Sequence, residues 1–175
     1  MIHLWNQKRM AVVLAGKVDL YIYRAWYEGC DFVTPKFYRQ VILPRLKSNA
    51  ALAHEHGARF GYICSSGILP RLDDYLEAGI DALIGIDPVQ GTYTNLAAFK
   101  KQTAERLCLW GGISGAVTVE MGEEEEIRVA VREAIETLGP AGFILSPVDN
   151  ITVDAPQTWR NLEVFLDEWR RRRHV

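Results

Sequence analysis

The sequence predicts an α/β protein built from about five strand–helix units. One complete unit spans residues 60–86, where two short apolar runs flank a helical segment that begins at Pro70 and ends at Gly79. Two parallel strands need such a crossover helix between them. Further apolar runs alternate with helical patterns before and after this unit, so we expect a mostly parallel sheet.

The helix of this central unit is amphipathic. Leucine and isoleucine recur at helical spacing and predict its buried side, at Leu69, Leu72, Leu76 and Ile80. The charged residues between them are expected to face water, and they are Arg71, Asp73, Asp74 and Glu77.

The elements before the central unit follow the same rules. An apolar segment at residues 10–15 predicts a helix, and residues 19–24 alternate aliphatic and aromatic side chains as a strand does. Thr34 is suited to cap a helix and Pro35 to open it, and the helical pattern then continues to Gly57. Pro44 predicts a kink or a break within that helix.

The elements after the central unit complete the alternation. A strand meets two glycines, Gly111 and Gly112, and we expect it to end in a tight turn there; the alternative is that the glycines let the backbone approach a ligand closely. The long helix near residue 130 has glutamates in its first turn, where the helix dipole favours anions. The predicted elements are a helix at 95–103, a strand at 107–110, a helix at 123–138, a strand at 142–146 and a helix at 156–173.

Composition limits the class of protein. A length of 175 residues suits one domain, and 20 basic against 22 acidic residues give a formal net charge of -2. This balance supplies no positive field for nucleic acid or an anionic membrane, so we expect neither as a partner. No apolar run approaches the roughly 20 residues of a membrane span. The opening residues lack a signal peptide, and three cysteines without metal or redox spacing fit a cytoplasmic protein.

Polar residues gather where the predicted strands end. The carboxyl ends of parallel strands meet at one edge, where α/β enzymes carry their chemistry. Three acids there are candidate catalytic bases: Glu28, Asp87 and Asp149. The candidate substrate contacts are Arg24, Tyr27, Asp31, Tyr62, Ser66, Gln90, Trp110 and Asn150. A simpler interpretation is that Asp87 closes a turn before Pro88 and that Asp154 caps the last helix.

Three stretches carry a family resemblance. They resemble the C-terminal half of the uroporphyrinogen decarboxylase superfamily, which also contains methyltransferases that move methyl groups between corrinoid proteins and thiols. The resemblance extends over residues 19–169 and rests on the order of the segments LPRLKSNAALAHEHGARFGYICSSGILPRLDDYLEAGIDALIGIDPVQG, LCLWGGISG and LGPAGFILSPVDNITVDAP.

The resemblance implies the C-terminal part of a (β/α)8 barrel, a fold that typically needs about 250 residues. Residues 1–175 would then be a single domain that lacks the N-terminal strands of the barrel; the alternative is an open parallel α/β sheet. A partial barrel has exposed edge strands, which proteins normally pair or cover. We therefore expect either a homo-oligomer or a missing N-terminal half as partner.

The resemblance also implies two kinds of site. The methyltransferase branch binds zinc through a His-x-Cys pair and a later cysteine, and these positions correspond here to Tyr62, Cys64 and Asp149. Because a neutral phenol is a weak ligand, no cofactor is certain, zinc is possible, and Cys64 is the candidate ligand. The simpler interpretation of Cys64 is a small buried thiol. The decarboxylase branch needs no cofactor, but its aspartate and arginines belong to the N-terminal part.

Three functions follow from these expectations. The first is methyl transfer involving a corrinoid or related one-carbon substrate when the barrel is complete, with a small molecule or a corrinoid protein as partner. The alternatives are decarboxylation of a tetrapyrrole, uroporphyrinogen, and a non-catalytic half-barrel that oligomerises. Whether the chain alone is an enzyme stays open, because the catalytic residues of the N-terminal half are absent.

Overall fold

The computed structural model describes residues 2–92, 94–103 and 106–173. Its centre is one sheet of five parallel strands in the order β1-β2-β3-β4-β5, which confirms the predicted α/β class. Each strand is short and apolar. The strands are β1 (Leu20–Arg24), β2 (Arg59–Ile63), β3 (Ala82–Ile86), β4 (Cys108–Ser114) and β5 (Phe143–Val148).

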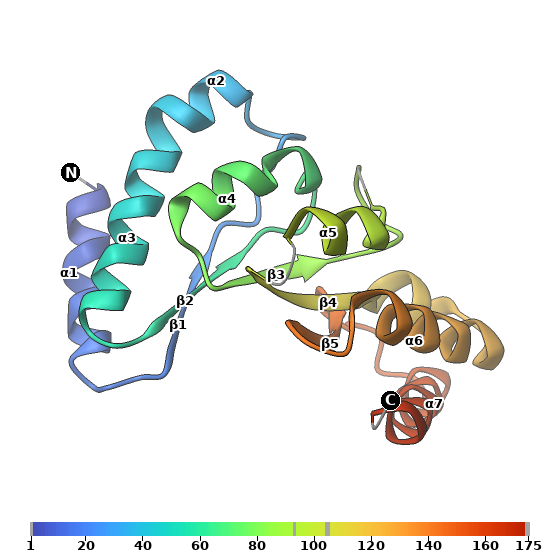
Figure 1. The fold of residues 1–175 in the computed structure, drawn as a ribbon. Coiled ribbons are helices and arrows are strands. Elements are labelled where there is room, and N and C mark those ends of the chain that lie inside the picture. The colour runs from blue at the N-terminus through green and yellow to red at the C-terminus, as the bar shows by residue number, and fades with distance from the viewer. Residues whose placement is uncertain (1, 93, 104–105, 174–175) are drawn as a thin grey trace.

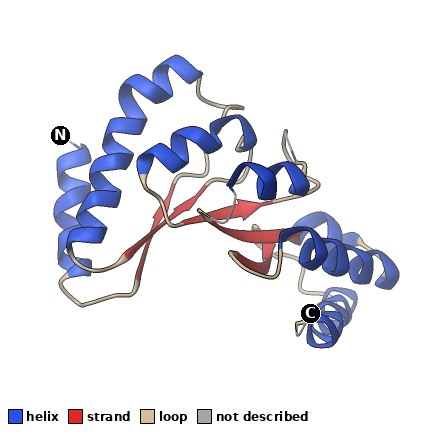
Figure 2. Ribbon diagram, viewed as in Figure 1, coloured by secondary structure: helices blue, strands red, loops and turns tan. Residues whose placement is uncertain are grey.

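Helices connect successive strands and gather along one side of the curved sheet (Figures 1 and 2). None of the described helices is both long enough and apolar enough to cross a membrane. The long helices are α1 (Ile2–Leu14), α3 (Leu43–Glu55), α4 (Leu72–Ala78), α5 (Leu96–Thr103), α6 (Glu124–Leu138) and α7 (Pro156–Arg172). The short helical segments are α2 (Pro35–Phe37), η1 (Tyr38–Ile42), η2 (Leu69–Arg71) and η3 (Gly115–Val119).

The strand order explains why the helices share one side. Crossovers between parallel strands are right-handed, so a sheet whose strands follow in chain order carries its crossover helices on one face. A doubly wound sheet would instead reverse its strand order at a switch point. The sheet is open, and its winding is that of a segment of a (β/α)8 barrel.

The two faces of the sheet differ in burial. On the face toward the helices, Tyr62, Leu83 and Leu109 are fully buried. On the opposite face, here called the inner face, one row of side chains crosses all five strands in register: Arg24, Ile63, Ile84, Trp110 and Ile144. Ile144 is 42% exposed, and Ile22 of the row below is 39% exposed. The inner face is therefore an apolar surface without a cover among the described residues.

Two charged residues at the start of α4, which we expected to face water, are buried. Asp73 and Glu77 face solvent as expected, but Arg71 is only 1% exposed and Asp74 only 3%. The loop after β1 folds over this side of the helix, and the Val33 carbonyl accepts a hydrogen bond from Arg71 (2.5 Å). Helical periodicity within α4 cannot reveal a cover that comes from a distant segment.

Two backbone features also differ from the prediction. Gly111 and Gly112 lie inside β4 and form no turn. Gly111 has a φ of +141°, and a Cβ there would lie 2.7 Å from the Ile86 carbonyl oxygen, so its lack of a side chain lets β3 and β4 pack closely. The predicted break at Pro44 takes the form of a π-helical turn, η1, directly before α3.

Candidate functional site

The loops after the first three strands are bound to one another. The Cys30 amide, in the loop after β1, donates to the Gly67 carbonyl after β2 (3.0 Å). Thr92, after β3, donates its hydroxyl to the Asp31 carboxylate (2.5 Å). Gly29 approaches Ser66 so closely that a Cβ on Gly29 would overlap the Ser66 carbonyl oxygen. This end of the sheet is therefore a fixed platform, and it carries Asp31 and Ser66, two of the predicted site residues.

Glu28 and Tyr62 form a direct pair. The Tyr62 hydroxyl donates to the Glu28 carboxylate (2.6 Å), and Tyr62 is fully buried on the helix side of the sheet. Its ring lies 5.2 Å from the Tyr75 ring, which in turn meets Tyr38 at 6.1 Å. Burial raises the pKa of Glu28, although the hydrogen bond from Tyr62 acts in the opposite direction. A carboxyl of this kind can exchange a proton closer to neutral pH than an exposed one.

Cys64 lies beside this pair and is fully buried. Its thiol is directed at the Ser66 carbonyl oxygen (3.6 Å), and burial raises the thiol pKa to about 11, which disfavours the thiolate that zinc requires. Burial also raises the pKa of Tyr62, so its phenol stays neutral. Among the described residues, no three His, Cys, Asp or Glu side chains are grouped to hold a metal. The residues present do not fit a zinc ion.

Asp87 and Gln90 hold the exits of β3 and β4 together. The buried Asp87 carboxylate accepts hydrogen bonds from the backbone amides of Val89 (2.8 Å) and Gln90 (2.9 Å), so it closes the turn after β3. The Gln90 side chain donates to the Ser114 hydroxyl at the end of β4 (3.0 Å). These contacts give Asp87 the turn-forming role that the simpler interpretation assigned to it.

Asp149 and Asn150 follow β5 and are exposed. Asp149 has a left-handed backbone (φ +65°), and its carboxylate accepts from the Asn150 amide (2.7 Å). Asp154, further along the same loop, does not cap α7 as expected: the N-cap residue is Ala155, without a side-chain hydrogen bond, and the Asp154 carboxylate accepts from the Trp159 indole (2.8 Å). No hydrogen bond or ion pair among the described residues joins Asp149 to Glu28.

Arg24 and Trp110 lie in the same row of the inner face. Three strand spacings of about 4.8 Å separate β1 from β4, so the two positions are roughly 14 Å apart along the row. The Arg24 guanidinium lies over the Trp26 ring, 5.7 Å from its centroid. Tyr27 is exposed and packs edge-to-face on Phe32 (5.2 Å). The predicted site residues thus fall on two sides of the sheet, with Glu28, Tyr62 and Cys64 apart from the inner face.

The prediction missed the buried ionic residues beneath the platform. The Arg71 guanidinium lies 4.1 Å from the Tyr38 ring centroid and 3.6 Å from the Asp74 carboxylate, which also accepts from Arg39 (2.9 Å). The one signal in the sequence is the spacing of Arg71 and Asp74, three residues apart on a helix. That spacing is equally typical of a solvated pair, so it does not predict burial.

A variant tests the proton affinity of Glu28. Because the pKa of Glu28 is raised above its ordinary 4.5 in the folded protein, the folded state binds this proton more tightly than the unfolded state does. The stability from this proton is complete below the ordinary pKa and is lost as the pH rises through the raised one. Glu28→Gln should therefore gain stability relative to the wild type between pH 4 and pH 7, measured by urea unfolding. A pH-independent difference would contradict the raised pKa.

Comparisons with known proteins agree with this architecture. The sequence profile of the family described as uroporphyrinogen decarboxylase (URO-D) matches residues 16–171. No curated protein sequence matches the chain. Among solved structures, a methyltransferase from Methanosarcina mazei is similar, with a TM-score of 0.75 at 18% identity. The match covers 94% of this chain and 47% of that chain, so this chain spans about half the length of its structural relative. The profile match over most of its length places the chain in the uroporphyrinogen decarboxylase family.

Proposed function

We propose that this chain is the C-terminal half of a barrel that transfers a methyl group, with a corrinoid or a related one-carbon compound as substrate. The observation that carries the proposal is the uncovered inner face, which would line the interior of a closed barrel. The similarity in fold between this chain and about half of a methyltransferase chain also supports a barrel completed by further strands. Arg24 and Trp110 lie on this face, while Asp87 and Asp149 follow β3 and β5.

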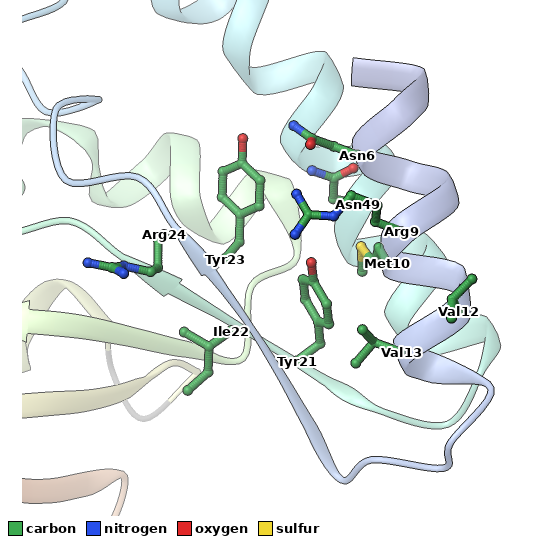
Figure 3. Close-up of a pocket in the computed structure, with 10 residues that line it drawn as sticks. All are labelled: Asn6, Arg9, Met10, Val12, Val13, Tyr21, Ile22, Tyr23, Arg24 and Asn49. Carbon is green, nitrogen blue, oxygen red and sulfur yellow. The ribbon is translucent and has the colours of Figure 1, made fainter. Parts of the chain in front are cut away.

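The free edge of β1 supports closure by further strands. A groove of about 610 Å³ runs between α1 and β1, and consecutive β1 residues, from Tyr21 to Arg24, line it. Figure 3 shows Met10 and Val13 of α1 across from this edge. Each of β2 to β5 follows a crossover helix and pairs with the strand that comes before that helix. Helix α1 stands directly before β1, in the position of such a crossover helix. We propose that the N-terminal half of the barrel, or a second copy of the chain, pairs with this edge.

The inner face suits a flat, largely apolar ligand with acidic groups. Trp110 offers an aromatic surface for stacking, and Arg24 offers a guanidinium for a carboxylate. These two residues equally favour the second candidate function, decarboxylation of uroporphyrinogen, because that tetrapyrrole carries carboxylate side arms for a guanidinium and pyrrole rings for an indole. The zinc chemistry of the methyltransferase branch is not part of the proposal, since the Cys64 environment does not fit it.

Binding of two tetrapyrrole ligands distinguishes these functions. The purified chain, with its mass measured by light scattering, is titrated with methylcobalamin and separately with uroporphyrin, and tryptophan fluorescence is recorded. We expect methylcobalamin to quench the wild type and Trp110→Phe to lose most of that quenching. Trp159→Phe, which changes an exposed indole on α7, is the matched control and should behave as the wild type.

The outcomes lead to different conclusions. Methylcobalamin binding followed by loss of its methyl–cobalt absorption when a thiol is added would support methyl transfer. Preferential binding of uroporphyrin would favour decarboxylation. A stable oligomer that binds neither compound would contradict both enzymatic functions and leave the half-barrel scaffold.

A further inference from the structure

We infer that a second, smaller pocket binds a small zwitterion such as an α-amino acid. The pocket lies between α1, β1 and α3 and has a volume of about 200 Å³. It is separate from the inner face, because Tyr23 and Glu28 line it from the helix side of the sheet. Its polar lining residues are His3, Asn6, Tyr23, Glu28, Arg45 and Asn49.

Asn49 is the first observation that points to a ligand. The residue is only 4% exposed, and its side-chain oxygen is buried without a hydrogen-bond partner among the described residues. Buried polar groups in native proteins are nearly always hydrogen-bonded, and an exception indicates a missing partner. Figure 3 shows Asn49 close to Asn6, at the junction of α1 and α3. A donor group placed in the pocket would supply the missing hydrogen bond.

The second observation is the pair of opposite charges around the pocket. The Glu28 carboxylate is held from behind by the Tyr62 hydroxyl (2.6 Å), which fixes its position. Arg45 lines the same pocket as Glu28, His3 and Tyr23, and its positive charge acts to lower the pKa of Glu28. No salt bridge among the described residues joins Glu28 to Arg45. The carboxylate is therefore available for an ammonium group and the guanidinium for a carboxylate.

The volume limits the size of the ligand. A water molecule takes about 30 Å³ in the liquid, so the pocket holds roughly seven waters. A ligand of about six or seven non-hydrogen atoms fits, as in alanine or serine, whereas a tetrapyrrole does not. The pocket shares Asn6, Tyr23 and Asn49 with the groove along β1, but its charged walls, Glu28 and Arg45, line the smaller pocket alone, so the inference does not rest on the proposed function of the inner face.

Isothermal titration calorimetry tests this inference on the purified chain. The probes are L-alanine, acetate and ethylamine, which carry both charges, the negative charge and the positive charge respectively. We expect saturable binding of alanine, with acetate and ethylamine each binding about tenfold or more weakly because each leaves one charged wall unpaired. Glu28→Gln and Arg45→Gln should each weaken alanine binding by a similar factor.

The control is Glu55→Gln, an exposed change on α3 outside the pocket, which should leave alanine binding unchanged. The inference is overturned if alanine gives no saturable heat, if acetate binds as tightly as alanine, or if Arg45→Gln binds alanine normally. Thermal unfolding of each variant is measured in parallel. Arg45 is exposed, so its variant decides the outcome even if Glu28→Gln folds poorly.

Discussion

Replacing Arg71 with methionine should lower the free energy of unfolding by about 3–5 kcal/mol, the typical cost of breaking a buried ion pair from one side. The guanidinium is almost completely buried, stacks on Tyr38 and donates to the Val33 carbonyl. Its loss leaves the Val33 carbonyl without this donor and removes one of the two cations beside Asp74. Urea unfolding followed by circular dichroism measures the change.

Arg39→Met is the matched control for Arg71→Met. Arg39 pairs with the same carboxylate, that of Asp74, but its side chain is 64% exposed. Most of the Arg39 side chain lies in water, which screens its attraction to Asp74, and Arg71 still lies beside that carboxylate in this variant, so we expect a smaller loss of about 1 kcal/mol. Equal losses in the two variants would mean that burial of Arg71 does not determine its contribution.

The second large effect is expected at Gly29. Alanine there should cost about 3 kcal/mol of unfolding free energy, at the upper end of overpacking effects, because its Cβ would overlap the backbone of Ser66. To relieve the overlap the loops after β1 and β2 must separate, which strains the hydrogen bond between Cys30 and Gly67. The same loops position Glu28, so binding of alanine should weaken in this variant as well.

Gly57→Ala separates packing from backbone effects. Gly57 has a left-handed backbone (φ +76°), but no atom lies within 4 Å of the position a Cβ would take. Only the backbone cost of about 1–2 kcal/mol should remain, and it is measured by the same urea unfolding. If Gly29→Ala lost no more stability than Gly57→Ala, the close contact between the two loops would be disproved.

Much of the fold could be predicted because its strands are short apolar runs bounded by glycine and proline. The runs at residues 60–64 and 82–86 match β2 and β3 almost residue by residue. The ends of β4 and β5 could not be predicted locally. Gly111 stays in its strand because β3 and Val148 pack against it, and Pro147 is tolerated because β5 is an edge strand.

The candidate site was harder to predict than the fold. Tyr62 and Cys64 lie at a strand exit, as expected, but the run FGYIC is apolar on both sides and does not reveal which face meets the helices. Register with β1 and β3 decides this, and it directs Tyr62 toward α4 and Ile63 to the inner face. The loop that buries Arg71 is likewise a contact between segments far apart in the chain.

The strand order also bears on how the protein forms during synthesis. Each of β2, β3, β4 and β5 pairs with the strand that left the ribosome just before it, so no strand waits for a distant partner. The paired residues lie 21–39 positions apart, the separation that one crossover helix requires, and chains fold from the N-terminus as they emerge. The sheet can therefore grow one unit at a time, and each new strand pairs with the edge that its predecessor left open.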